Sequence, residues 1–407
     1  MRPLLRLLRF VLKLQGAVVM GGRPRPTEDA VEIRVRRRGN AKPRCPECRR
    51  VLRGKIARRQ REWRHLDLIR TRTIVVAEVR EGYCNKHGRR VERVPWAAPA
   101  SRHTHAFDGA VASLVQVADK TAAHRMFRVA WRTVGRIVER VVADLLPEDR
   151  FESLELIGID ETSYKRGHRY LTVVINLITG RVVWLGKGKS AKTLVAFFEE
   201  IGPERSRRIK MVAMDMSEAY KKAVDEYASQ AAIVYDRFHV VKLLLEAIDE
   251  IRREEVRGLE GDARKELKNT RYALFRNPKR HMSKKDHVAI ERIRRTNKKL
   301  ARAYELRCDF EELWELRDPE EAKEFLMNWT RSALLSKRPP LRKFANTIRK
   351  HLDGVLGFFK FWGTTSGVVE GTNNKIKLAI HRAFGFHSID ALMSMVYLCC
   401  GGLVITW

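Results

Sequence analysis

Three β-prone segments follow one another directly between residues 154 and 185, and helical and β-prone segments then alternate as far as residue 236. The first three segments are LELIGID, RYLTVVINL and RVVWL, with the Thr179-Gly180 turn before the third. They are followed by the helical AKTLVAFFEEIG, the β-prone IKMVAMD, the helical SEAYKKAVDEYA and the β-prone AAIVYD. Strands joined by short turns and then strands alternating with helices predict an α/β fold with a mixed sheet.

Two of the predicted strands end in an aspartate. Asp160 ends the first strand, and Asp215 ends the first strand that follows a helix. Strands that neighbour in a sheet would bring these carboxylates together at one edge, where they repel each other unless a cation lies between them. Mg²⁺ or Mn²⁺, which prefers oxygen ligands, is the natural occupant. Glu161 follows Asp160 directly, but successive strand residues face opposite ways, so only one of the two can share a metal with Asp215.

A third carboxylate, Glu370, lies on a predicted helix near the C-terminus. At about 100° per residue this helix has a polar face and an apolar face. The polar face carries Glu370, Asn373, Asn374, Lys377 and His381, and the apolar face carries Val369, Thr372, Ile376, Ile380 and Ala383. The apolar face can pack on a sheet, while Asn373, Asn374 and Lys377 are candidate DNA contacts beside the acid. The alternative for each carboxylate is an ordinary solvated surface group.

Four residues near the N-terminus have the spacing of a zinc site. Cys45-Pro-Glu-Cys48 is a CxxC knuckle, and Cys84-Asn-Lys-His87 repeats its spacing with His as the last ligand. Three thiolates and an imidazole complete a tetrahedral shell with no position open for catalysis, so we predict structural Zn²⁺. The alternatives are unliganded cysteines and a redox CxxC, and the redox site is disfavoured because no thioredoxin-like βαβ pattern is near.

Residues 118–142, ADKTAAHRMFRVAWRTVGRIVERVV, predict a helix, a tight turn and a second helix. In the second helix Val134, Ile137, Val138 and Val141 share an apolar face, and Arg132, Arg136 and Arg140 recur every four residues along another. A recognition helix requires this arrangement, because one face packs and the other meets DNA phosphates and base edges. The turn lacks the usual glycine, and an ordinary packed helical hairpin is the alternative.

The charge balance indicates a polyanionic partner. The 407 residues include 82 Lys and Arg against 49 Asp and Glu, a formal net charge of +33. Nucleic acid is the first candidate because neutralised phosphates release condensed counterions. Solubility and attraction to an anionic membrane surface are the alternatives. The N-terminal leucines are interrupted by basic residues and no apolar run is long enough to span a bilayer, so we expect a cytoplasmic protein without a membrane partner.

Motifs along nearly the whole chain resemble those of the DDE transposases of bacterial insertion sequences, in particular the ISL-three family. In order they are RCPEC, YCNKHG, VPWAAP, WRTVGRIVERV, GIDETSY, YLTVVINLITGRVVW, FFEEIGPER, MDMSEAY, DRFHVVKLL and GVVEGTNNKIK. DRFHVVKLL and EGTNNKIK are the most specific of these. The sequence departs from the family at Thr365-Ser366-Gly367, where similar proteins usually have Ser-Asn-Gly, and at Ser217-Glu218, where they have Trp-Pro.

The resemblance implies an RNase H-like catalytic core interrupted by an all-α insertion and preceded by a zinc-ribbon-like β domain and a helix-turn-helix. These parts are expected as a zinc-ribbon-like DNA-binding domain at 1–95, a helix-turn-helix at 96–150, the first part of the core at 151–240, the insertion at 241–360 and the last part of the core at 361–407. Asp160, Asp215 and Glu370 match the family's catalytic metal-binding triad. Asp236 and His239 match a DxxH signature that follows the second aspartate.

The expected function is that of a DNA transposase, which binds the terminal inverted repeats of an insertion sequence and catalyses metal-dependent cleavage and strand transfer. Water would free a 3′-hydroxyl at the element end, and this hydroxyl would attack target DNA with Mg²⁺ or Mn²⁺ at the site. A homodimer is expected, because two element ends must be held in one synapse at the bacterial nucleoid. Two alternatives remain: a non-catalytic regulator that uses only the zinc module and the helix-turn-helix, and an RNase H-like nuclease without strand transfer.

Overall fold

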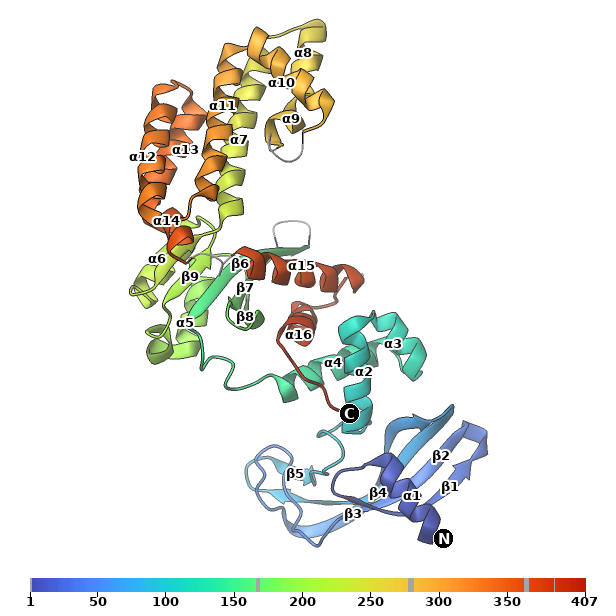
Figure 1. Ribbon diagram of the computed structural model, residues 1–407. Coiled ribbons are helices and arrows are strands. Elements are labelled where there is room, and N and C mark those ends of the chain that lie inside the picture. Colours follow the sequence, from blue (N-terminus) through green and yellow to red (C-terminus); the bar gives the residue numbers. More distant parts are fainter. Residues whose placement is uncertain (1, 166–168, 277–281, 362–365, 384) are drawn as a thin grey trace. The chain divides into compact units, whose positions relative to one another are not determined.

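The computed structural model describes residues 2–165, 169–276, 282–361, 366–383 and 385–407. The chain divides into two compact units: Met1–Leu146 together with His381–Trp407, and Pro147–Ile380 (Figure 1). The finer boundaries expected near residues 95, 150, 240 and 360 stay predictions. Within the described ranges, no helix is both long enough and apolar enough to cross a membrane.

The first unit begins with helix α1 (Arg2–Leu12) and a five-stranded sheet. The strands are β1 (Ala17–Arg25), β2 (Ala30–Arg37), β3 (Arg53–Leu68), β4 (Thr71–Cys84) and β5 (Gly88–Val91), with the 3₁₀ helix η1 (Pro26–Glu28) after β1. Their order is β1-β2-β4-β3, and β5 pairs with β4. Only the pairing of β2 with β4 is parallel among these described pairings. Val75, Ala77 and Val79 alternate along β4 and belong to the buried layer together with Ile33 of β2 and Trp63 of β3, which is the period expected of a half-buried sheet.

Three helices follow in the same unit: α2 (His105–Val117), α3 (Lys120–Phe127) and α4 (Trp131–Leu145). Asp119 caps α3, because its carboxylate accepts the N–H of Ala122 at 2.8 Å. Arg128 ends α3 in the left-handed region, with φ of 53°, where a glycine is usual. Helix α16 (Ile389–Cys400) packs against α2 and α4. The predicted helix-turn-helix is therefore confirmed, and an arginine takes the place of the missing glycine in its turn.

The second unit is built on a mixed five-stranded sheet. Strands β6 (Leu156–Lys165), β7 (Arg169–Asn176) and β8 (Arg181–Lys187) are antiparallel neighbours. Strands β9 (Met211–Met214) and β10 (Ala232–Tyr235) join beside β6 in parallel, through crossovers that contain α5 (Ala191–Ser206) and α6 (Glu218–Tyr227). The resulting order β10-β9-β6-β7-β8 is that of the RNase H-like sheet, so the predicted fold class is confirmed.

The segment after β10 is all-α in the part that the structure describes, as predicted. Its elements are α7 (Arg237–Arg257), α8 (Gly261–Lys268), α9 (Arg271–Phe275), α10 (Lys284–Thr296), α11 (Lys298–Glu312), η2 (Leu313–Glu315), α12 (Pro319–Leu335), α13 (Pro339–Lys350) and α14 (Leu352–Lys360). In Figure 1 these helices leave the sheet through the long α7 and return through α14, which packs against β10. Aromatic rings fill the centre of this body, where Phe310 contacts Trp329 and Phe344. The helix α15 (Ser366–Arg382) follows.

Candidate functional site

Three aspartates lie in one row across the sheet of the second unit. Asp160 and Asp215 each stand two residues beyond Gly158 and Ala213, which are paired in the parallel β6–β9 ladder, so the two aspartates are level. Asp236 directly follows the last paired residue of β10 and is level with Asp215. The row lies directly beyond the carboxyl ends of the parallel strands β9 and β10, at the kind of edge where α/β sheets bind ligands. Strand β6 continues to Lys165 through its antiparallel pairing with β7, so the prediction that Asp160 ends its strand is wrong.

A small cavity lies over this row. Its lining residues are Ile159, Asp160, Ala213, Met214, Asp215, Asp236, His239 and Val369. Val369 comes from α15, and its Cγ2 would lie 2.8 Å from a Cβ atom at position 158. Gly158 is therefore needed for α15 to approach β6 beside Asp160. The structure brings together four of the predicted residues here, two aspartates of the triad and both residues of the DxxH signature.

Burial raises the pKa of both Asp160 and Asp215. Asp160 has two hydrogen-bond donors: the N–H of Glu161, 2.6 Å from Oδ1, and the Nδ2 amide of Asn373 at Oδ2. Oδ1 of Asp215 is buried and has no hydrogen-bond partner among the described residues. Two neighbouring desolvated carboxylates, one of which has an unpartnered oxygen, fit a hard divalent cation.

Asp236 and His239 form a hydrogen-bonded pair at the start of α7. Asp236 accepts the N–H of Phe238 at 3.0 Å as the helix cap, and its other oxygen lies 3.0 Å from Nδ1 of His239. The hydrogen bond with Asp236 raises the pKa of His239, and the charges of Asp160 and Asp215 act in the same direction. The pair therefore places a positive charge beside the two carboxylates when the imidazole is protonated.

Glu161 has different neighbours from Asp160. It is paired with Thr172 of β7, and its carboxylate accepts a hydrogen bond from the Tyr220 hydroxyl, which also lies 2.8 Å from the Thr172 hydroxyl. Burial raises the pKa of Glu161 in spite of that bond. The alternation of strand side chains thus separates the two adjacent carboxylates. Tyr220 could not be anticipated, because its position on α6 carries no acid or metal-ligand pattern.

Helix α15 carries the remaining predicted residues of this region. Its buried residues include Thr372, Asn373, Ile376 and Ala379, and its exposed residues include Glu370, Asn374 and Lys377. The apolar face predicted from the helical period thus lies toward the interior of the unit. Asn373 reaches Asp160, whereas Glu370 is not among the residues that line the cavity. Thr365, at the departure from Ser-Asn-Gly, lies outside the described residues.

Cys45, Cys48, Cys84 and His87 come together in the first unit, with ligand atoms that all lie within 4.8 Å of one another. Sγ of Cys45 lies 3.5 Å from Nδ1 of His87, and Sγ of Cys48 lies 3.5 Å from Sγ of Cys84. A tetrahedral zinc ion with bonds of about 2.3 Å to sulfur and about 2.0 Å to nitrogen needs edges of roughly 3.5–3.8 Å. The cluster fits the ion and suggests structural zinc.

Two further residues support this cluster and were not foreseen from the spacing. Oε2 of Glu47 lies 3.3 Å from Nε2 of His87, and Arg90 donates to the other oxygen of Glu47 at 2.7 Å. A carboxylate on the second nitrogen of a ligand histidine fixes its ring orientation and its tautomer. Burial raises the pKa of the Cys84 thiol, but the backbone N–H groups of Lys86 and His87 lower it to a net value of about 6.

The basic residues predicted on α4 have two different environments. Arg132 and Arg136 are exposed, while Val134, Ile137, Val138 and Val141 are buried. Arg140 is half-buried, and its Nε donates to the buried carboxylate of Asp108 on α2 at 2.8 Å. Arg132 and Arg136 are free of the interior and can meet DNA, whereas Arg140 joins two helices of the unit.

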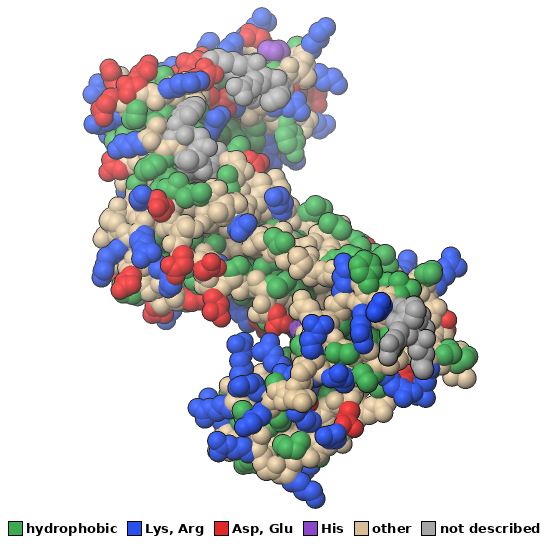
Figure 2. Space-filling model, turned by 60° about the horizontal axis from the view of Figure 1, so that its bottom comes forward, with side chains coloured by type: hydrophobic (Ala, Val, Ile, Leu, Met, Phe, Trp, Pro, Cys, Tyr) green, Lys and Arg blue, Asp and Glu red, His purple; other side chains and the backbone are tan. Residues whose placement is uncertain are grey.

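Figure 2 shows many Lys and Arg side chains spread over the N-terminal sheet domain, with other side chains between them. Exposed basic residues of this domain include Arg36, Arg38, Lys42, Arg44, Arg49, Arg50, Arg53, Lys55, Arg58 and Arg59. Such a surface matches the phosphate backbone of nucleic acid.

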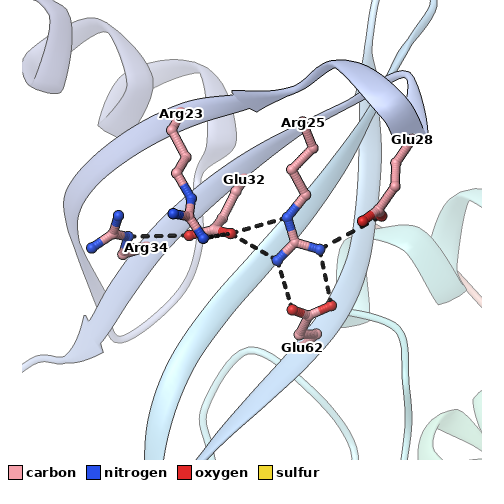
Figure 3. Close-up of polar contacts among 6 residues, drawn as sticks. All are labelled: Arg23, Arg25, Glu28, Glu32, Arg34 and Glu62. Atoms are coloured by element: carbon pink, nitrogen blue, oxygen red, sulfur yellow. Dashed lines mark hydrogen bonds and ion pairs between the residues drawn. The ribbon is translucent and has the colours of Figure 1, made fainter.

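One buried carboxylate organises three arginines on the same sheet (Figure 3). Glu32 on β2 is 1% exposed, and it accepts hydrogen bonds from Arg23 at 2.9 Å, Arg25 at 2.7 Å and Arg34 at 3.1 Å. Arg25 also bonds Glu62 on β3 at 2.6 Å, so the cluster links three strands. These arginines are held by the fold and differ in this respect from the solvated basic residues around them.

Comparison with known protein families gives three matches along the chain. Residues 157–396 match a family model described as transposase. Residues 92–142 match the helix-turn-helix domain of transposase family ISL3, and residues 41–87 match the zinc-finger of transposase IS204/IS1001/IS1096/IS1165. The first match contains the aspartate row, and the third contains all four residues of the Cys/His cluster.

Curated relatives match over most of their length. The transposase for insertion sequence element IS1557 of Mycobacterium tuberculosis is 36% identical over 403 residues, which is 91% of this chain and 89% of that protein. The transposase for insertion sequence element IS1001 of Bordetella parapertussis is 33% identical over 330 residues, 80% of this chain and 81% of that protein.

Proposed function

This chain belongs to the ISL3 family of insertion-sequence transposases, and on that premise we propose that it cleaves and joins DNA at a DDE-type site formed by Asp160, Asp215 and Glu370. Membership of a transposase family supports enzymatic cleavage and transfer of DNA. The observation that carries the assignment to this site is the pair of half-buried carboxylates that lie level on the neighbouring strands β6 and β9, one of which has an oxygen without a hydrogen-bond partner among the described residues.

We assign Mg²⁺ or Mn²⁺ to this site, with Asp160 and Asp215 as ligands and Glu370 as the third carboxylate. The donors are all oxygens, as hard divalent cations require. Glu370 directly follows the cavity-lining Val369 on α15, and its carboxylate is exposed and not engaged in the interior. When bound, such ions make water a stronger nucleophile and neutralise the charge that develops on the scissile phosphate.

The other cavity residues orient the DNA. When the imidazole of His239 is protonated, its Nδ1–H donates to Asp236, and its Nε2–H is then available to donate to a non-bridging oxygen of the scissile phosphate. None of the cavity-lining residues in the described part of the chain is Ser, Thr, Cys or Tyr, so the lining offers no hydroxyl or thiol for a covalent DNA link. Hydrolysis at the element end therefore frees a 3′-hydroxyl, and this hydroxyl attacks the target DNA.

DNA binding involves the first unit and the exposed side of α15. We propose that the zinc-ribbon domain, held by Zn²⁺ at its Cys/His cluster, binds the terminal inverted repeats together with Arg132 and Arg136 of the helix-turn-helix. Asn374 and Lys377 are exposed on α15 and are proposed to contact the DNA backbone near the catalytic site. A homodimer follows from the reaction, because two element ends have to be held together before they are joined to the target.

The proposal is tested with the terminal-repeat DNA that flanks the gene, incubated with purified full-length protein and Mg²⁺. The wild type is expected to cut at the repeat end, leave a 3′-hydroxyl and join that end to a second DNA. Asp215→Ala should lose both activities and retain repeat binding in a mobility-shift assay. Cleavage without joining would indicate a nuclease, binding without cleavage would indicate a regulator, and either result contradicts the proposal.

A further inference from the structure

Asn373 is the one residue of the predicted polar face of α15 that is buried with its side chain against a catalytic candidate. It is 7% exposed, and its Nδ2 amide donates to Oδ2 of Asp160. Its Oδ1 is buried and has no hydrogen-bond partner among the described residues. The next residue, Asn374, is exposed, so neighbouring asparagines occupy opposite environments.

The packing of α15 determines where Asn373 lies. Val369 closes against Gly158, two residues before Asp160 on the same strand. Thr372 donates to the carbonyl of Gly180 at 3.4 Å, and Ile376 is completely buried. Val369, Thr372 and Ile376 therefore hold α15 in place on both sides of Asn373, and Asn373 itself is not needed for these contacts. Its amide is held at Asp160 by the fold, so the contact with the carboxylate is preorganised.

The chemistry of this contact favours a role in orienting the carboxylate. Asp160 has one oxygen held by the N–H of Glu161 and the other held by Asn373, so neither oxygen can rotate away without losing a donor. The opposite orientation of the amide would put Oδ1 against the carboxylate, oxygen against oxygen. The Nδ2 group of Asn373 thus donates to Asp160, although the Oδ1 atom of the same amide is buried without a partner among the described residues. Buried polar atoms without a partner are rare, and a functional role is one explanation for them.

We propose that Asn373 is a positioning residue for Asp160, which it holds in the orientation that binds the divalent cation, and that it does not contact DNA. This inference rests on the proposed function, because it assumes that Asp160 is a metal ligand. Removal of a partner that orients a metal ligand typically lowers metal affinity about 10–100-fold. Asn373→Ala should therefore weaken Mn²⁺ binding by at least about tenfold and leave DNA binding in the absence of metal unchanged.

The experiment is calorimetric titration of the full-length protein with Mn²⁺ alone, beside a mobility-shift assay in EDTA. Leu378→Ala, at an exposed position of the same helix, is the matched control and should bind Mn²⁺ and DNA like the wild type. Asn373→Leu keeps the number and branching of the side-chain heavy atoms and removes the unpartnered oxygen. It should be folded as judged by thermal unfolding and should bind Mn²⁺ more weakly than the wild type. It serves as the test variant if Asn373→Ala does not fold.

The outcomes separate the two proposals. A wild type that does not bind Mn²⁺ contradicts the metal site itself, and with it the proposed function. A wild type that binds Mn²⁺ while Asn373→Ala and Asn373→Leu bind it equally well contradicts the positioning role alone. Weaker DNA binding by these variants with unchanged Mn²⁺ affinity would show that Asn373 contacts DNA, and would also overturn the inference.

Discussion

Replacement of Glu32 by Gln should destabilise the N-terminal sheet more than any exposed substitution near it. Hydrogen bonds from Arg23 and Arg25 outweigh the effect of burial and lower the pKa of Glu32 from its ordinary value of 4.5 to about 2. Through the linkage between protonation and folding, this lowering corresponds to about 3 kcal/mol of stability at neutral pH. Because the folded pKa is depressed, that stability is fully present above pH 4.5 and is lost as the pH falls toward 2.

The matched control is Glu62→Gln. Glu62 binds the same Arg25 but has a side chain that is 47% exposed, so its replacement should cost less than about 1 kcal/mol. The assay is hydrogen exchange of the full-length protein at pH 7, followed by mass spectrometry of peptides from β1 and β2. A loss of about 3 kcal/mol corresponds to roughly 100-fold faster exchange of their protected amides. Exchange in Glu32→Gln within threefold of the wild type would refute the reasoning.

Three further predictions concern the first unit. Cys84→Ser should lower the zinc content measured by elemental analysis from one ion per chain to a small fraction, and an unchanged content would contradict the assigned ligand set. Arg136→Ala should weaken binding to repeat DNA and lower the magnitude of the slope of log affinity against log salt concentration by about 1. Arg140→Ala should leave that slope unchanged and lower the melting temperature. The reverse pattern would contradict the assignment of Arg136 to DNA and of Arg140 to the contact between α2 and α4. Burial lowers the pKa of His65 from 6.5 to about 4, so stability should fall as the unfolded state takes up a proton below pH 6.5, by about 2 kcal/mol at pH 5. In thermal unfolding, His65→Gln should reduce the loss of stability between pH 6.5 and pH 5. A loss equal to that of the wild type would show that the buried imidazole of His65 is not its cause.

The parts of the site that depend on local patterns could be predicted from the sequence. Asp160 and Asp215 end apolar runs, and their meeting required only that the strands neighbour each other in parallel, as they do. The zinc cluster followed from two half-sites of equal spacing, and the helix-turn-helix from its apolar period. Each of these predictions uses geometry within one element or a single pairing of two elements.

Other features depend on which side chains meet across elements, and periodicity does not determine this. Arg140 has the same spacing on α4 as Arg136, but only Arg140 lies opposite Asp108. Asn373 and Glu370 share the predicted polar face of α15, yet the packing of Val369 on Gly158 brings Asn373 to Asp160. The assignment of Glu370 as the third ligand stays a prediction. The backbone gives a similar example at Arg128. This residue adopts the left-handed conformation at a position where a glycine is expected from sequence rules.

The central claim is that the carboxylate of Asp160 serves catalysis while that of its neighbour Glu161 does not. It is tested most directly by comparing Asp160→Ala with Glu161→Gln in Mg²⁺-dependent cleavage of terminal-repeat DNA, with repeat binding measured in parallel. We expect no detectable cleavage by Asp160→Ala. Cleavage by Glu161→Gln should stay within about tenfold of the wild type, which is a change of less than about 1.4 kcal/mol in the barrier. Both variants should bind the repeat normally. Cleavage by Asp160→Ala at the rate of the wild type would contradict the claim.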